Sequence, residues 1–180
     1  MICVERHGSA KTTLSDVAAE LGVIRQTVYR YYPSLADLLA AVAQAGLDDF
    51  VTRMQDHLAH ATSPAEAAIE SIVFAVQAIP NEPYIGLLFQ AGETDIFSRG
   101  VTSSLGLSLG AQILRGIPVN WSEIGVAETE LEGLAEILMR LFVSFLQYPA
   151  DPPRSEAELR SLVERWLGPA LRGRAAATGV

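Results

Sequence analysis

The amino-acid sequence predicts an all-α fold, with a small helical unit at residues 1–33 and a larger one at residues 34–180. Three observations lead to this prediction. Apolar residues recur three and four positions apart, which is the spacing of one face of a helix. No segment alternates apolar and polar residues as a half-buried strand does. Helix start and stop signals, with Ser or Thr before an apolar run and Gly or Pro after it, recur along the chain.

The expected helices lie, in chain order, at residues 13–21, 24–32, 34–58, 64–79, onward from Pro83, 101–115, 127–147 and onward from Ser155. The segments expected to connect them include residues 92–100, "GIPVNWSEIG" at 116–125 and "YPADPPRS" at 148–155. Pro64 and Pro80 border one of these helices, because proline fits the first turn of a helix but not its interior. The helix after Pro83 is expected to carry Ile85, Leu88 and Phe89.

Three of these helix starts have a recognisable cap. Thr13 is the expected N-cap of the first helix. Ser34 with Asp37, and Ser155 with Glu158, match the capping box, in which a serine and an acid three residues later satisfy each other's backbone N–H groups. Gly22 follows the first helix, where a left-handed residue closes a helix at little cost.

The composition excludes several classes of protein. Apolar residues make up 49% of the chain and charged residues 19%, which supplies a core and argues against disorder. No uncharged apolar run reaches the ~18 residues of a membrane span, and the N-terminus lacks the layout of a signal peptide. The single cysteine, Cys3, excludes an internal disulfide framework. We therefore expect a cytoplasmic protein without a membrane partner.

The net charge of −8 is distributed unevenly. Residues 1–33 hold four basic and three acidic side chains and so carry +1, whereas the remainder holds nine basic and eighteen acidic ones and carries −9. A polyanion is therefore repelled least by the N-terminal segment.

The first two predicted helices, joined by a turn that contains Gly22, form a helix-turn-helix pattern. The residues expected to face the core of this unit are Val17, Ala18, Leu21, Ile24, Val28 and Tyr32. At 100° per residue, Gln26 and Arg30 then point away from the core, flanked by Thr27 and Tyr29. Their amide, guanidinium and hydroxyl groups can read base edges and bond phosphates. An ordinary solvated helix can carry the same side chains, so the pattern alone leaves both interpretations open.

The string "TTLSDVAAELGVIRQTVYRYYPSLADLLAAV", residues 12–42, resembles the DNA-binding domain of the TetR family of transcriptional regulators. The matching pieces are Thr12-Thr13, Asp16-Val17-Ala18, Leu21-Gly22-Val23, Thr27 to Tyr32, and Ser34 with Leu38-Leu39. The resemblance implies a homodimeric, ligand-responsive repressor rather than an enzyme. Its N-terminal three-helix domain would bind double-stranded DNA at an inverted repeat, and its larger helical domain would bind an apolar small molecule.

The resemblance also assigns roles to single residues. The residues it implies at the DNA are Ser15, Arg25, Gln26, Thr27 and Tyr29, with Arg30 and Tyr31 extending the surface. Two positions depart from the family pattern, because Ile24 replaces the usual serine cap and Leu35 replaces a phosphate-binding lysine. The short "MICVERHG" before the match looks like the tail of the family's first helix, so either the chain begins late or the small domain lacks part of its core. These departures favour the alternative of a helical ligand-binding or scaffolding protein that has lost DNA binding.

The larger unit contains candidate ligand and dimer residues. The aromatic residues that are candidates to line a pocket are Phe74, Phe89, Phe97, Trp121 and Phe142. The helix at 127–147 is apolar on more than one face and is expected to join the last helix in a dimer interface. The residues expected there are Phe145, Leu159, Leu162 and Trp166.

No motif points to a cofactor or to catalysis. His57 and His60, beside Asp56, lack a third ligand in a matching motif, so a metal site is not predicted. Cys3 has no identifiable base, and neither a nucleophile elbow nor a phosphate-binding loop is present in the sequence.

Overall fold

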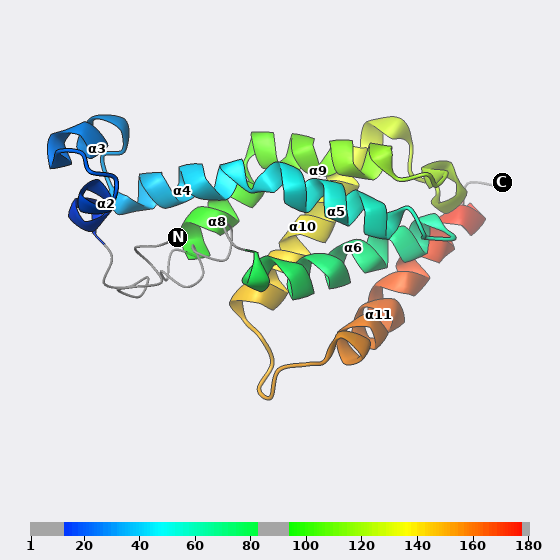
Figure 1. Ribbon diagram of the computed structural model, residues 1–180. Coiled ribbons are helices and arrows are strands. Elements are labelled where there is room, and N and C mark those ends of the chain that lie inside the picture. The colour runs from blue at the N-terminus through cyan, green and yellow to red at the C-terminus, as the bar shows by residue number, and fades with distance from the viewer. Residues whose placement is uncertain (1–12, 83–93, 178–180) are drawn as a thin grey trace. The chain divides into compact units, whose positions relative to one another are not determined.

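The computed structural model describes residues 13–82 and 94–177, and every regular element in these ranges is a helix (Figure 1). The predicted all-α class is confirmed. The α-helices are α2 (Leu14–Glu20), α3 (Arg25–Tyr31), α4 (Leu35–Ala45), α5 (Leu47–Leu58), α6 (Pro64–Ala78), α8 (Thr94–Val101), α9 (Ser104–Gly116), α10 (Leu131–Gln147) and α11 (Glu156–Ala177). Short 3-10 helices are η2 (Ile79–Asn81), η3 (Trp121–Ile124) and η4 (Glu128–Glu130). The helix predicted after Pro83, with Ile85, Leu88 and Phe89, lies outside the described residues.

The chain divides into two compact units. The first comprises the residues up to Phe50 together with Ile79–Arg99, and the second comprises Val51–Ala78 together with the residues from Gly100 onward. Helix α4 therefore belongs to the same unit as α2 and α3, and α5 runs from one unit into the other. None of the described helices is both long enough and apolar enough to cross a membrane.

The helix-turn-helix of the first unit forms as predicted. Thr13 caps α2 in a full capping box with Asp16, whose carboxylate accepts from the Thr13 backbone N–H at 2.8 Å. Gly22 has φ +66°, and the N–H groups of Gly22 and Val23 bond back to carbonyls near the end of α2, which is the Schellman arrangement. The buried residues that join the two helices are Leu14, Ala18 and Val28, against which Leu35 and Leu38 of α4 pack.

Two residues predicted to face this core are exposed instead. Leu21 is 66% exposed and Ile24 is 68% exposed. Leu21 is the C-cap of α2 and Ile24 the N-cap of α3, so both lie in the turn, where a helical 100° step no longer sets the side-chain direction. Leu14, one turn before Ala18, is the leucine of α2 that is buried with Ala18 and Val28.

Three helix boundaries also differ from the prediction. The single helix expected at 34–58 is interrupted at Gly46. The backbone hydrogen bonds there are long, at 3.3 Å from the Gly46 N–H to the Val42 carbonyl and 3.4 Å from the Phe50 N–H to the Gly46 carbonyl. Glycine in a helix interior lowers helix stability by about 1 kcal/mol relative to alanine, which explains why the helix is interrupted at this residue. The prediction of a loop at 92–100 is wrong, because residues 94–101 form α8, an amphipathic helix. The helix expected from residue 127 begins as η4 and becomes α-helical at Leu131.

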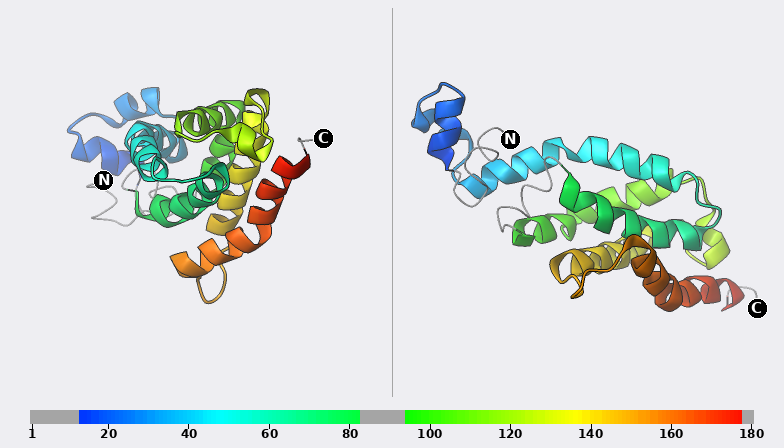
Figure 2. Two further views of the ribbon diagram at one scale, coloured as in Figure 1. Left: turned by 90° about the vertical axis from the view of Figure 1, so that its right-hand side faces the viewer. Right: turned by 60° about the horizontal axis from the view of Figure 1, so that its bottom comes forward.

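The second unit is a packed set of helices around α6. Helix α10 packs against α9 and α6, and α11 packs against α6 and η3. In Figure 2, α10 and α11 are the yellow to red ribbons, and α6 and α9 are green. Gly110 of α9 permits close approach to α10, because a Cβ atom there would come within 2.7 Å of the Met139 sulfur. The largest fully buried side chains of this unit are Leu58, Pro64, Ile69, Ile72, Val73 and Leu131. Trp121 is also buried, and its indole N–H donates to the Leu114 carbonyl at 3.0 Å.

Candidate nucleic-acid interface

Helix α3 presents a polar face to solvent and a single fully buried residue to the core. Val28 is buried, whereas Thr27 and Tyr32 are half-buried. The exposed residues of the helix are Arg25, Gln26, Tyr29, Arg30 and Tyr31. The predicted outward direction of Gln26 and Arg30 is thus confirmed, and five of the seven residues of α3 are exposed.

The arginines of α3 are associated with its tyrosines. Arg25 Nη2 donates to the Tyr29 hydroxyl at 2.9 Å, and the Arg25 Cζ lies 4.8 Å from the Tyr29 ring centroid. Arg30 Nη2 donates to the Tyr31 hydroxyl at 3.1 Å, with its Cζ 5.0 Å from that ring. Each guanidinium retains further N–H donors, since arginine has five. The helix carries no acidic side chain, so its surface is positively charged and rich in hydrogen-bond donors.

The two departures noted in the sequence lie at residues that border α3. Ile24 is the N-cap of α3 and makes no side-chain cap hydrogen bond, so a serine's usual contribution of about 1 kcal/mol is absent here. Leu35 packs against the buried cluster of Leu14, Ala18 and Val28, which gives this position a structural role. Ser15 in the first turn of α2 is half-buried.

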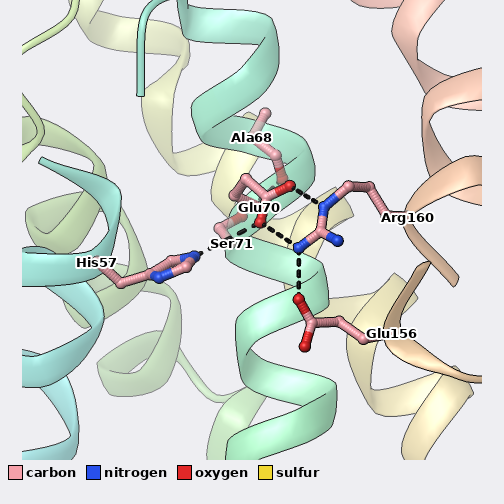
Figure 3. A network of polar contacts seen from close by, with 6 residues as sticks. All are labelled: His57, Ala68, Glu70, Ser71, Glu156 and Arg160. Carbon is pink, nitrogen blue, oxygen red and sulfur yellow. Dashed lines mark hydrogen bonds and ion pairs between the residues drawn. The ribbon is translucent and has the colours of Figure 1, made fainter. Parts of the chain in front are cut away.

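A second cluster of charged side chains joins three helices of the second unit (Figure 3). The carboxylate of Glu70 on α6 accepts two hydrogen bonds from Arg160 of α11, one from Nε at 2.5 Å and one from Nη2 at 3.0 Å. Arg160 Nη2 also donates a hydrogen bond to Glu156 at 2.6 Å. His57 of α5 lies 3.5 Å from Glu70 and stacks on Phe74 at 4.9 Å between ring centroids. The hydrogen bond from Arg160 holds the pKa of the Glu70 carboxyl below its usual value, against the opposing effect of burial.

This charged cluster has a structural explanation rather than a ligand. The Glu70 side chain is only 17% exposed, and the residues it meets come from α5 and α11, so the ion pair connects helices that are distant in sequence. Among the described residues, no group of three His, Cys, Asp or Glu side chains could hold a metal ion. Sequence reasoning missed the pair, because Glu70 and Arg160 are 90 residues apart and share no motif.

Replacing Arg160 by Ala is expected to lower the free energy of unfolding by about 1–2 kcal/mol, because it leaves the half-buried Glu70 without its main donor. The matched control is Arg140→Ala, which breaks an exposed ion pair to Glu136 one turn away and should cost less than about 0.5 kcal/mol. Urea denaturation of both variants measures the difference.

The effect of Arg160→Ala also depends on pH. A carboxyl with a lowered folded-state pKa stabilises the protein above its unfolded-state pKa, and this contribution disappears as the pH falls through the folded-state pKa. The gap between wild type and Arg160→Ala should therefore close in acid. Equal losses for the two arginine variants, at neutral pH, would show that the cluster is only a surface contact.

The candidate pocket and dimer residues lie in the second unit, apart from Phe89 and Phe97. Trp121 and Phe142 are buried and Phe74 is half-buried, whereas the side chains of Phe89 and Phe97 lie outside the described residues.

Of the residues expected at a dimer interface, Leu159 is buried within the protomer, Phe145 and Leu162 are half-buried, and Trp166 is 72% exposed. The apolar stripe predicted on α11 therefore points into the protomer at Leu159 and away from it at Trp166.

Comparison with known proteins finds a family and a relative that are similar to parts of this chain. Residues 2–42 match the family model described as bacterial regulatory proteins, tetR family. Over 73 residues the chain is 36% identical to the HTH-type transcriptional repressor LfrR of Mycolicibacterium smegmatis. This match spans 41% of the chain and 37% of that relative's length. The family match thus covers α2, α3 and most of α4.

Proposed function

The chain is a member of the tetR family of bacterial regulatory proteins through its residues 2–42, and on this premise we propose that it is a DNA-binding transcriptional repressor. It binds a palindromic operator as a homodimer and releases it when a small apolar molecule binds. The observation that carries the proposal is the exposed, donor-rich face of α3 in a helix-turn-helix whose first helix is capped by Thr13 and closed by Gly22.

The chemistry of α3 suits the major groove of DNA. Arg25 and Arg30 can each donate two hydrogen bonds to a guanine edge, whereas the Gln26 amide can donate one hydrogen bond to adenine N7 and accept one from its N6 amino group. Thr27 and Ser15 carry hydroxyls that suit phosphate contacts, which fix register without reading sequence. The second helix of a helix-turn-helix enters the major groove with its N-terminal residues at the base edges, and Arg25 and Gln26 occupy these positions in α3.

A protein that has lost DNA binding is the alternative function. The feature that favours it is Ile24, an aliphatic N-cap that cannot bond a phosphate and leaves the first N–H groups of α3 without a side-chain acceptor. The net charge of −8 also opposes association with DNA at long range. The two functions differ in one measurable property, which is sequence-specific DNA affinity.

Wild-type protein is expected to retard a palindromic fragment from the region near its own gene more strongly than random DNA at the same salt. Arg30→Ala should weaken operator binding by about 1–3 kcal/mol if its guanidinium reads a base. Arg140→Ala removes the same charge from the exposed surface of α10 and should leave operator binding unchanged. Equal binding of the wild type to operator and random DNA, in a gel-shift titration at low salt, would favour the alternative function.

The effector is proposed to be apolar or aromatic and to bind in the second unit. Phe74, Trp121 and Phe142 come from α6, η3 and α10, and α6 packs against both of the other elements. Binding would favour a conformer whose two recognition helices are misaligned with successive major grooves. Helix α4 follows α3 directly through Tyr32 and Pro33, which makes it the natural lever. An effector at ~100 times its dissociation constant adds about 2.7 kcal/mol of stability, which a thermal-shift screen of lipophilic compounds detects.

A further inference from the structure

Arg25 and Tyr29 form the best-defined side-chain pair on the recognition helix. They lie one turn apart, at i and i+4, where side chains on a helix meet. The pair combines a hydrogen bond of 2.9 Å from Nη2 to the hydroxyl with a ring contact at 4.8 Å from Cζ to the centroid. Both residues are exposed, so the pair is not a by-product of core packing.

The pair restricts a side chain that is otherwise among the most mobile. A free arginine loses much rotamer freedom when it is fixed against a ligand, and a side chain that is already ordered loses less. The hydrogen bond to Tyr29 uses one of the five guanidinium N–H donors. Four donors remain, and a guanine edge requires two. Tyr29 can therefore hold the guanidinium without competing with a base for it.

We propose that Tyr29 is a positioning residue, which orders the Arg25 guanidinium on the surface of α3 so that its remaining donors meet a guanine edge in the operator. The inference rests on the proposed function and specifies how that site selects its DNA. It assigns the tyrosine hydroxyl to the arginine rather than to the DNA.

The first test needs no DNA. Nitrogen-15 relaxation of the Arg25 Nε–H group in the free protein should report a more ordered side chain in wild type than in Tyr29→Phe, and the least order in Tyr29→Leu, which loses the ring as well. The Nε–H of Arg140, which is held by Glu136 at 2.8 Å, serves as the reference that neither change affects. Equal Arg25 mobility in wild type and both variants would overturn the proposal, whatever the protein binds.

The second test is a double-mutant cycle on operator affinity. Tyr29→Phe should weaken operator binding about two- to tenfold in the wild-type background, the range expected for one arginine side chain that must be ordered on binding. It should cause no further loss in the Arg25→Ala background, and both variants should relax base preference at the same base pair. Tyr148→Phe, at an exposed tyrosine of the second unit, is the control that should bind as wild type does.

The outcomes separate the inference from the proposed function. The same loss from Tyr29→Phe in both backgrounds would show that the hydroxyl contacts DNA by itself, and the positioning role would be wrong. A wild type that does not distinguish operator from random DNA would refute the proposed function instead. In that case the relaxation measurement still decides whether Tyr29 orders Arg25.

Discussion

Replacing Leu114 by Ala is expected to lower the free energy of unfolding by about 3–4 kcal/mol, since a buried leucine-to-alanine change loses both transfer free energy and packing. Leu114 lies on α9 and is 3% exposed. Its backbone carbonyl accepts the indole N–H of Trp121, so a cavity at this position also loosens the surroundings of that buried ring. Urea denaturation followed by circular dichroism measures the loss.

The matched control for this prediction is Leu105→Ala on the same helix. Leu105 is 75% exposed, so the same chemical change should alter stability by no more than about 0.5 kcal/mol. The two substitutions make the same chemical change, and the difference between their effects on stability therefore mainly reports burial. Similar losses for Leu114→Ala and Leu105→Ala would mean that α9 does not pack as described.

Replacing Trp166 by Glu is expected to convert the proposed homodimer into a monomer. Trp166 is 72% exposed in the protomer and borders a groove of about 560 Å³ whose lining also includes Leu162. Ile137 of α10 is likewise exposed, at 53%. A second copy that covers Trp166 would lose the apolar contact of the ring and would have to desolvate the new carboxylate. The expected cost is on the order of 3 kcal/mol or more, which is at least about a hundredfold in the dissociation constant.

Light scattering at micromolar concentration distinguishes the two states, because one protomer has a mass of 19.4 kDa. Leu105→Glu is the matched control, as it places the same charge at an equally exposed apolar position of α9. It should leave the dimer intact. A wild type that scatters as a single protomer would refute the dimer. If only Leu105→Glu dissociates the dimer, the interface lies on α9 and the role proposed for Trp166 is wrong.

The helix starts show how far the sequence alone determined local structure. Ser34 and Asp37 exchange hydrogen bonds at 3.0 and 3.1 Å, and Ser155 and Glu158 at 2.8 and 3.3 Å, as predicted. The left-handed Gly22 was likewise predictable. These features depend on groups within three residues of one another, so the residue types suffice to identify them.

The candidate DNA interface was predictable for a related reason. Val28 anchors α3 to the core, and the helical period then directs Gln26 and Arg30 outward. The same argument was wrong for Leu21 and Ile24, because these residues lie in the turn, where the helical period has already ended. The prediction therefore held inside the helix and not at its ends.

Only the tertiary structure decided which apolar residues form the core. Leu114 and Leu105 are the same residue type on one amphipathic helix, yet one is buried and the other exposed. The ion pair between Glu70 and Arg160 forms across 90 residues of chain, and its partners are visible only once α6 and α11 pack together. Caps and turns involve neighbouring groups that the sequence lists in order, whereas burial and ion pairing depend on partners that folding alone brings near.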